Sequence, residues 1–323
     1  MSSSVTSVPG GRPLGGVLLC VLALLIGLAG GVRAAAAPDF SGERAMAWVE
    51  RQCELGPRPP GSSALEALRR VIEAHADSLG LSCVRLCFTA TDPWRGGELE
   101  VCNLVVSAGP AGGERLWLGA HYDTRPAADR DRDPARRDEP ILGANDGGSG
   151  TAVLLHLMEL LAASPPQRGV DLLFFDAEDS GRSGDPGGFC VGSRHLAATW
   201  QDFASPLAAG RPQALVLLDM VGRRDLQIGM EGYSLQMAPE LTRAVFARAD
   251  ALELWAFVPT RATAVYDDHV PFLQAGIPAV DLIDFSFPEW HTTADTPAIC
   301  DPASLEAVGR LAASLIWDPL PGF

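Results

Sequence analysis

A histidine beside a tryptophan stands out near the C-terminus, in the stretch Phe285 to Pro297. His291 follows Trp290, and the carboxylate of Asp295 lies four residues further on. A bare imidazole against an apolar wall can bind a metal ion, although one such histidine is a weak signal. More residues of this kind lie at or just after the predicted strand ends earlier in the chain: His121, Asp123, Asp146, Glu178, Asp179 and Asp219.

The placement of these residues predicts one shared site, because binding sites in open α/β sheets form beyond the carboxyl ends of the strands. Each residue alone has a simpler interpretation; Asp146, for example, lies in the Gly-rich stretch 143–150 and would cap the next helix. Asp219 follows four apolar residues, and a buried carboxylate is costly unless it is paired or coordinated. Five segments carrying histidines and carboxylates therefore predict a Zn²⁺ site with one open position.

The neighbouring carboxylates of Glu178 and Asp179 are expected to have two different roles. In a bent loop, one of them can face the metal while the other stays free as a general base. The Gly-x-Ser patterns around Ser149 and Ser193 do not show the strand-turn-helix arrangement of a serine hydrolase, so nucleophilic catalysis by serine is disfavoured.

Apolar periodicity predicts the elements that position these residues. Helices are expected at 45–53, 64–79, 151–163, 238–251 and 302–316, and strands at 81–90, 99–107, 116–120, 170–175, 214–218 and 279–283. The Asp- and Arg-rich stretch 123–140 is expected to be a solvated loop. Short, almost wholly apolar strands alternating with helices predict an α/β, three-layer sandwich with a mostly parallel central sheet. No linker divides residues 38–323, so we expect a single domain there.

The composition limits the partners. The 323 residues carry a net charge of −15 and no lysine, which argues against nucleic acid and anionic membrane surfaces. Residues 1–37 contain Arg12, an uncharged run and a small-residue stretch, a pattern typical of a signal peptide, with an uncleaved N-terminal anchor as the alternative. We therefore expect an exported protein that is secreted, periplasmic or membrane-anchored on the outer side.

Six cysteines remain beyond the N-terminal segment, and the sequence cannot assign their pairing. Cys83 and Cys87 are expected to share a strand, which would place them roughly 13 Å apart and prevent a bond between them. The alternative is that several cysteines are small buried apolar residues.

Six motifs, taken in order, resemble those of the zinc aminopeptidase and glutaminyl cyclase superfamily. They are His121-Tyr-Asp-Thr124, the Gly-rich stretch 143–150, Phe175-Asp-Ala-Glu-Asp179, Gly192-Ser-Arg-His-Leu196, Leu217-Leu-Asp-Met220 and Trp290-His-Thr292. The stretches 56–62, 267–272 and 287–291 look more like a glutaminyl-peptide cyclotransferase than an aminopeptidase. The resemblance implies a zinc-exopeptidase-like fold and a zinc-dependent enzyme that converts the N-terminal glutamine of peptides or proteins to pyroglutamate, releasing ammonia.

The resemblance also implies roles for individual residues. Zinc would be bound by Asp146, Asp179 and His291. Glu178 would be the general acid/base, Asp219 and Asp268 would form a hydrogen-bonded carboxylate pair beside it, and Trp290 would line the substrate pocket. In aminopeptidases of the superfamily, the positions of His121 and Asp219 hold a second zinc, so a di-zinc aminopeptidase is the alternative. One zinc per chain is favoured, and a non-catalytic binding domain is the third interpretation.

Three positions depart from the pattern of the family. Asp179 stands where many relatives have glutamate, and Asp281 stands where animal cyclases carry histidine. The loop 180–188 lacks the tryptophan that helps line the pocket in animal enzymes, and Phe189 is not assigned that role. His269 is expected to be a structural hydrogen-bonding residue.

Overall fold

The computed structural model describes residues 6–7, 10, 37–182, 184–202 and 210–323. The predicted signal peptide or anchor at 1–37 falls almost wholly outside these residues, so it stays a prediction. Residues Ala36–Phe323 form one unit by their internal contacts. Among the described helices, none is long and apolar enough to cross a membrane.

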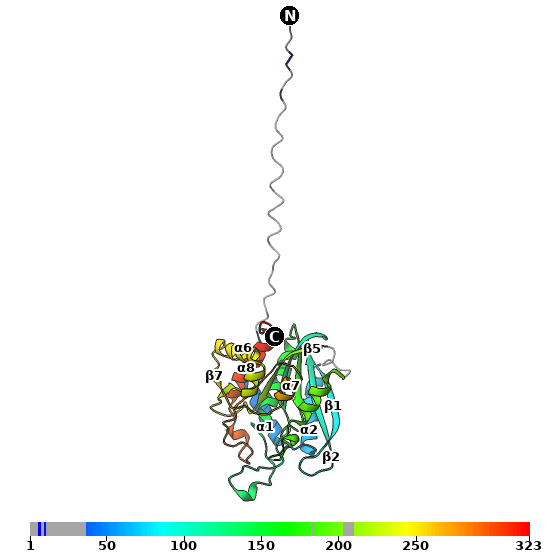
Figure 1. The fold of residues 1–323 in the computed structure, drawn as a ribbon, viewed down its shortest axis with the longest axis vertical. Coiled ribbons are helices and arrows are strands. Elements are labelled where there is room, and N and C mark those ends of the chain that lie inside the picture. The colour runs from blue at the N-terminus through cyan, green and yellow to red at the C-terminus, as the bar shows by residue number, and fades with distance from the viewer. Residues whose placement is uncertain (1–5, 8–9, 11–36, 183, 203–209) are drawn as a thin grey trace. The chain divides into compact units, whose positions relative to one another are not determined.

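A six-stranded sheet forms the centre of this unit, in the order β1-β2-β4-β3-β5-β8 (Figure 1). Its strands are β1 (Ser82–Thr91), β2 (Glu98–Ala108), β3 (Gly113–His121), β4 (Gly169–Phe175), β5 (Gly210–Asp219) and β8 (Ala279–Ile283). The pairs β4–β3, β3–β5 and β5–β8 are parallel, whereas β1–β2 and β2–β4 are antiparallel. The predicted mostly parallel sheet is confirmed, with an antiparallel hairpin at one edge.

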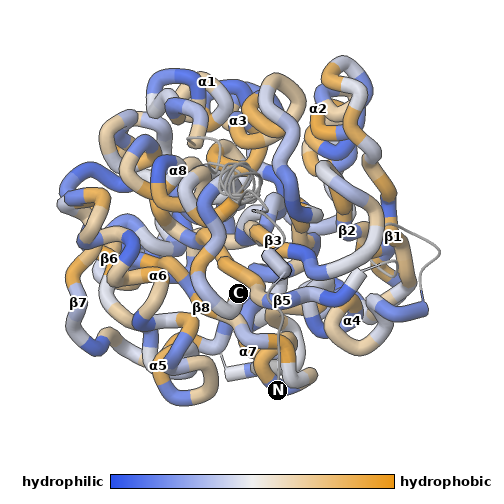
Figure 2. Tube along the Cα trace, turned by 90° about the horizontal axis from the view of Figure 1, so that it is seen from above, coloured by the Kyte–Doolittle hydropathy of each residue, from blue (hydrophilic) through white to orange (hydrophobic). Residues whose placement is uncertain are grey.

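Helices cover both faces of the sheet, which explains why β4 and β8 are buried along their whole length. The helices are α1 (Gly42–Glu54), α2 (Ser63–Ser78), α3 (Gly148–Ala163), α4 (Val191–Thr199), α5 (Gly232–Met237), α6 (Pro239–Ala251), α7 (His269–Gln274) and α8 (Pro302–Trp317). Figure 2 shows α1, α3 and α8 on one side and α4, α5 and α7 on the other, in agreement with the contacts α1–α3, α1–α8, α4–α7 and α5–α7. The predicted three-layer sandwich is thus confirmed.

The Gly-rich stretch before α3 is bent in a way that only glycine allows. Gly147 has φ +83°, and a Cβ there would lie 2.4 Å from the carbonyl oxygen of Asp123. The loop therefore packs directly against the loop that follows β3. This contact brings Asp146 next to His121.

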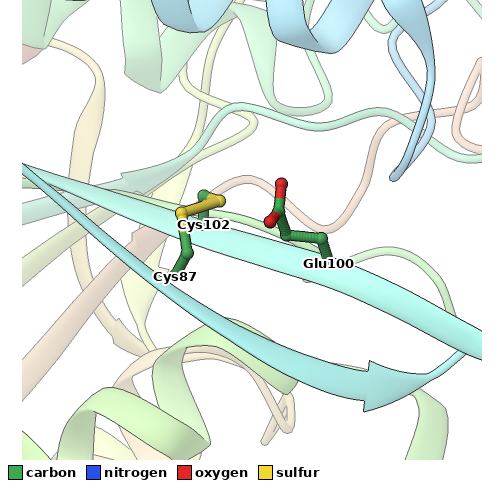
Figure 3. A group of neighbouring side chains, drawn as sticks. All are labelled: Cys87, Glu100 and Cys102. Atoms are coloured by element: carbon green, nitrogen blue, oxygen red, sulfur yellow. A yellow bond between two sulfur atoms is a disulfide. The ribbon is translucent and has the colours of Figure 1, made fainter.

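One disulfide joins the edge strand β1 to its neighbour β2. Cys87 of β1 is bonded to Cys102, which lies directly opposite on β2, and Figure 3 shows Glu100 beside the sulfur–sulfur bond. Cys83 and Cys87 do share β1, as expected. Because the two sulfur atoms of this Cys-Glu-Cys group are bonded to each other, the group is not a metal site.

The predicted helices and strands all occur, with bounds shifted by a few residues. The sequence did not predict α4, α5, α7 or the small parallel pair of β6 (Ile228–Met230) and β7 (Phe257–Arg261). The prediction that 123–140 is solvated is wrong at its start, because Asp123, Thr124 and Arg125 are buried. Their polar atoms bind the neighbouring loops instead of water, as described below.

Candidate active site

A pocket of about 330 Å³ opens at the carboxyl ends of β4, β5 and β8. The structure brings six of the predicted site residues into its wall: Asp146, Glu178, Asp179, Asp219, Trp290 and His291. They come from four separate segments of the chain, which the parallel strands deliver to one edge of the sheet.

Asp146, Asp179 and His291 form a buried group of possible metal ligands. Their ligand atoms all lie within 4.8 Å of one another. His291 Nε2 is 3.4 Å from Asp179 Oδ2 and 3.8 Å from Asp146 Oδ2. Neither of these two oxygens has a hydrogen-bond partner among the described residues. Since unpaired buried carboxylate oxygens are costly, one nitrogen and two bare oxygens fit a divalent ion such as zinc.

Arg125 and Asp129 orient this group, although the sequence analysis assigned no role to either. Arg125 Nη1 donates to Asp179 Oδ1 at 2.6 Å, and its other nitrogens donate to Asp129 at 2.7 and 2.9 Å. Asp129 Oδ1 in turn lies 3.3 Å from His291 Nδ1. A carboxylate on one ring nitrogen leaves the other nitrogen free to bind a metal. No sequence signal distinguishes these two residues from their Asp- and Arg-rich surroundings.

Two further aspartates hold the backbone of the site. The carboxylate of Asp123 accepts the amide N–H groups of Glu178 and Asp179, at 3.1 and 3.2 Å. Asp295 accepts those of Asn145 and Asp146, at 2.8 and 3.0 Å. The stretch that carries His291 is thereby tied to the Gly-rich loop.

His121 and Asp219 form a second group with Asp146. His121 Nε2 lies 3.1 Å from Asp219 Oδ1 and 3.2 Å from Asp146 Oδ1. Burial disfavours the charged imidazole, but the carboxylates of Asp123, Asp146 and Asp219 outweigh it and raise the pKa of His121 well above its ordinary value. These atoms can therefore satisfy one another in the absence of a metal.

Glu178 stands apart from both groups at the pocket wall. Its side chain is half-buried, and Glu178 Oε1 lies 3.4 Å from the sulfur of Cys190. Burial raises the pKa of the Glu178 carboxyl well above its usual range, and the nearby Asp179 and Asp267 act in the same direction. A carboxylate with a raised pKa is suited to accept and return a proton near neutral pH.

The structure places Asp267, rather than the predicted Asp268, beside Glu178. Asp267 lines the pocket and falls within 4.8 Å of Glu178 and Cys190. Asp268 is fully buried, and its Oδ1 accepts a hydrogen bond from Ser193 Oγ. The hydrogen-bond contact of Asp219 is with His121, not with Asp268. Consecutive residues direct their side chains differently, so the dipeptide alone could not indicate which aspartate faces the pocket.

Aromatic side chains form the mouth of the pocket. Trp290 packs on His291 with ring centroids 3.9 Å apart and on Phe285 at 4.8 Å. Phe285 and Tyr266 line the pocket and are about two-fifths exposed. Phe189, which received no role from the sequence, also lines it. His269 hydrogen-bonds Glu231 at 3.1 Å, in keeping with the expected structural role.

Comparison with known proteins identifies the family and the fold of this chain. Residues 103–316 match the model of peptidase family M28. A mouse glutaminyl-peptide cyclotransferase-like protein is 31% identical over 291 residues, covering 81% of this chain and 72% of that protein. The structure of Porphyromonas gingivalis glutaminyl cyclase has a TM-score of 0.79 and 34% identity, covering 85% of this chain and 96% of that one.

A Zn-dependent exopeptidase from Parabacteroides distasonis is equally similar in fold, with a TM-score of 0.81 and 30% identity over 88% of this chain and 100% of that one. These neighbours confirm the predicted zinc-exopeptidase-like fold. The chain belongs to peptidase family M28, and within it groups with the glutaminyl-peptide cyclotransferases.

Proposed function

We propose that this chain is a zinc-dependent glutaminyl-peptide cyclotransferase, which converts the N-terminal glutamine of peptides or proteins to pyroglutamate and releases ammonia. The observation that carries the proposal is the carboxylate of Glu178, free of both ligand groups, at the wall of a small pocket lined by Trp290. The relatives named as glutaminyl cyclases support the same activity.

Asp146, Asp179 and His291 would hold the zinc, which when bound supplies Lewis-acid polarisation of the side-chain carbonyl. Glu178 accepts a proton from the α-amine of the substrate as the amine nitrogen bonds to the side-chain carbonyl carbon. It then delivers that proton to the side-chain amide nitrogen, whose bond to carbon breaks, so that ammonia leaves. Asp267 lies close enough to Glu178 to influence its proton affinity.

The pocket shape supports an intramolecular reaction. Amine and carbonyl belong to one residue, so the site needs only to hold the glutamine side chain folded back on itself. The flat face of Trp290 and the neighbouring Phe285 provide an apolar wall for that compact form. The peptide beyond the first residue would leave through the open mouth.

Removal of an N-terminal residue by a di-zinc aminopeptidase is the second candidate. It is favoured by one observation: His121, Asp146 and Asp219 can also converge on one ion. We place it second because His121 already lies within hydrogen-bond distance of both carboxylates. In contrast, Asp146 Oδ2 and Asp179 Oδ2 are left bare. One zinc per chain is therefore the proposed content.

A parallel assay tests the two candidates. The purified protein is offered a peptide with N-terminal glutamine, followed by ammonia release and loss of mass, and leucine amide, followed by hydrolysis. Bound zinc is counted on the same sample. Ammonia release with about one zinc per chain supports the cyclase. Leucine release with about two would overturn it in favour of the aminopeptidase.

We also propose that the protein works in an oxidising compartment outside the cytosol. The disulfide between Cys87 and Cys102 supports this location, because such bonds persist mainly in exported proteins. Its partners would be peptides or proteins with N-terminal glutamine, and not nucleic acid, given the net charge of −15.

A further inference from the structure

The thiol of Cys190 contacts the carboxylate proposed as the catalytic base. Cys190 Sγ lies 3.4 Å from Glu178 Oε1. Within the described part of the chain, no other side chain or amide donates a hydrogen bond to that carboxylate. A carboxylate with a single donor owes its rotamer largely to that donor, since the second oxygen must face the reacting groups.

The backbone around Cys190 is arranged to bring the thiol to this position. The amide of Cys190 donates to Glu178 O at 2.8 Å, and those of Val191 and Gly192 donate to Ala177 O and Asp176 O at 3.0 Å each. Cys190 itself has φ +52°, an uncommon conformation for a residue with a side chain. These hydrogen bonds hold the loop after β4 against the start of α4, next to the proposed catalytic base Glu178.

A second carboxylate converges on the same thiol. One oxygen of Asp267 lies within 4.8 Å of Cys190 Sγ and of a Glu178 oxygen. Asp267 is about 97% buried, and its Oδ2 has no hydrogen-bond partner among the described residues. Cys190 is fully buried, and burial together with Glu178 and the nearby aspartates raises the pKa of its thiol. The sulfur therefore keeps its proton and can act as a donor between two carboxylates.

We infer that Cys190 is a positioning residue, whose S–H group donates to Glu178 and holds this carboxylate in the orientation needed for proton transfer. The inference rests on the proposed cyclase function for its catalytic consequence. The hydrogen bond itself can be observed without any turnover.

Two substitutions test the catalytic consequence. Cys190→Ala removes the donor and should lower kcat about tenfold, with KM within about twofold of wild type and zinc content unchanged. Cys190→Ser restores a donor and should recover kcat to within about threefold of wild type. Cys83→Ala removes another free thiol, on β1, and serves as the matched control with wild-type kinetics. Turnover of Cys190→Ala at the wild-type rate, or no recovery in Cys190→Ser, would overturn the inference.

Infrared spectroscopy of the S–H stretch tests the bond directly. At a pH at which Glu178 is ionised, wild type should show a thiol band shifted to low frequency by the charged acceptor, and the band should be absent from Cys190→Ala. In Glu178→Gln the acceptor loses its charge, so the same band should move to higher frequency. A band that does not respond to Glu178→Gln refutes the contact, even if Cys190→Ala fails to fold. Because this comparison needs no substrate, it stays decisive if the protein proves not to be a cyclase.

Discussion

The two ends of β4 carry buried carboxylates that differ in how they are satisfied. At the start of the strand, Asp171 receives 2.5 and 2.7 Å hydrogen bonds from Arg115, with further bonds from Trp117 Nε1 at 2.9 Å and Ser107 Oγ at 2.6 Å. Beyond the end of the strand, Asp179 Oδ2 has no partner among the described residues, and the same holds for Asp146 Oδ2.

This difference distinguishes a carboxylate that is satisfied within the fold from carboxylates that can still bind a ligand. Both oxygens of Asp171 are satisfied within the chain, so this carboxylate has no capacity left for a ligand. At the pocket, the bare oxygens cost stability in the absence of a bound ion and are available to one. Open oxygens alone do not mark the site, because Asp176 Oδ1, Asp268 Oδ2 and both oxygens of Asp281 also lack a partner among the described residues. Asp146 and Asp179 differ from these because their open oxygens converge with His291 at the pocket.

The largest effect on activity is expected at the pocket, beyond the carboxyl end of β4. Glu178→Gln should lower the rate of ammonia release about a thousandfold, because the amide cannot carry the proton between the two nitrogens. Zinc content should stay at the wild-type value, since Glu178 belongs to neither group of ligands. The exposed Glu100 on β2 supplies the control: Glu100→Gln should leave both quantities unchanged. Loss of zinc from Glu178→Gln would contradict the assignment of the base.

At the structural end, Arg115→Met should lower the free energy of unfolding by about 3 kcal/mol, because it leaves Asp171 as an uncompensated buried charge. Urea denaturation measures this loss, and zinc content should not change. A loss below about 0.5 kcal/mol would mean that Ser107 and Trp117 suffice for the carboxylate.

Asp146→Asn should have the opposite effect to Arg115→Met, because it should weaken zinc binding and leave stability nearly unchanged. In the metal-free protein it should change stability by less than about 1 kcal/mol in either direction, since Asp146 Oδ2 has no partner to lose and asparagine keeps an Oδ1 acceptor for His121 Nε2. Zinc affinity should fall by more than about a hundredfold, as measured by competition with a chelator. Strong destabilisation of the metal-free variant would show that Asp146 has a structural role like that of Asp171.

Glu231 lies next to the pocket, but its carboxylate accepts hydrogen bonds from within the chain, as that of Asp171 does. Burial opposes its ionisation, yet hydrogen bonds from His269 and from the amides of Ser234 and Tyr233 outweigh it and lower its pKa from 4.5 to about 2. The ionised group therefore adds stability that is fully present above about pH 4.5 and is lost as the pH falls toward 2. Glu231→Gln should cost about 2 kcal/mol at pH 6 and clearly less at pH 3. Urea denaturation of metal-free protein at both pH values checks this; an equal cost at both would contradict it.

The smallest effect is expected at the pocket mouth. Phe285 is 40% exposed and contacts Trp290 at one edge of the pocket. Phe285→Ala should raise KM about threefold and leave kcat unchanged, because the ring contributes apolar contact but touches no reacting atom. Steady-state kinetics with a glutaminyl peptide distinguish this from a fall in kcat, which would place Phe285 in the catalytic step.

Much of the site could be predicted from residues that follow apolar runs. The runs ending at Ala120, Phe175 and Leu218 each end one residue before the terminus of their strand or at it, so the polar residues after them reach one edge of the sheet. The short elements α5, α7, β6 and β7 could not be predicted, because segments of three to six residues show no reliable periodicity.

Other parts of the site depend on contacts between distant segments. Arg125 and Asp129 look like solvated loop charges until His291, more than 150 residues away, is placed beside them. The choice between Asp267 and Asp268 depends on the direction of the backbone at the start of α7. Cys87 pairs with Cys102 because the register of β1 and β2 sets them opposite each other.

By itself, the sequence determined the fold class and the family and predicted the side chains proposed to bind zinc, because periodicity and residue chemistry are local properties. Only the tertiary structure decided which carboxylate oxygens are left bare, which aspartate lies beside Glu178 and which donor contacts the Glu178 carboxylate. These outcomes are set by packing between segments far apart in the chain, where differences of a few ångströms determine whether a charged atom is paired or open to a ligand.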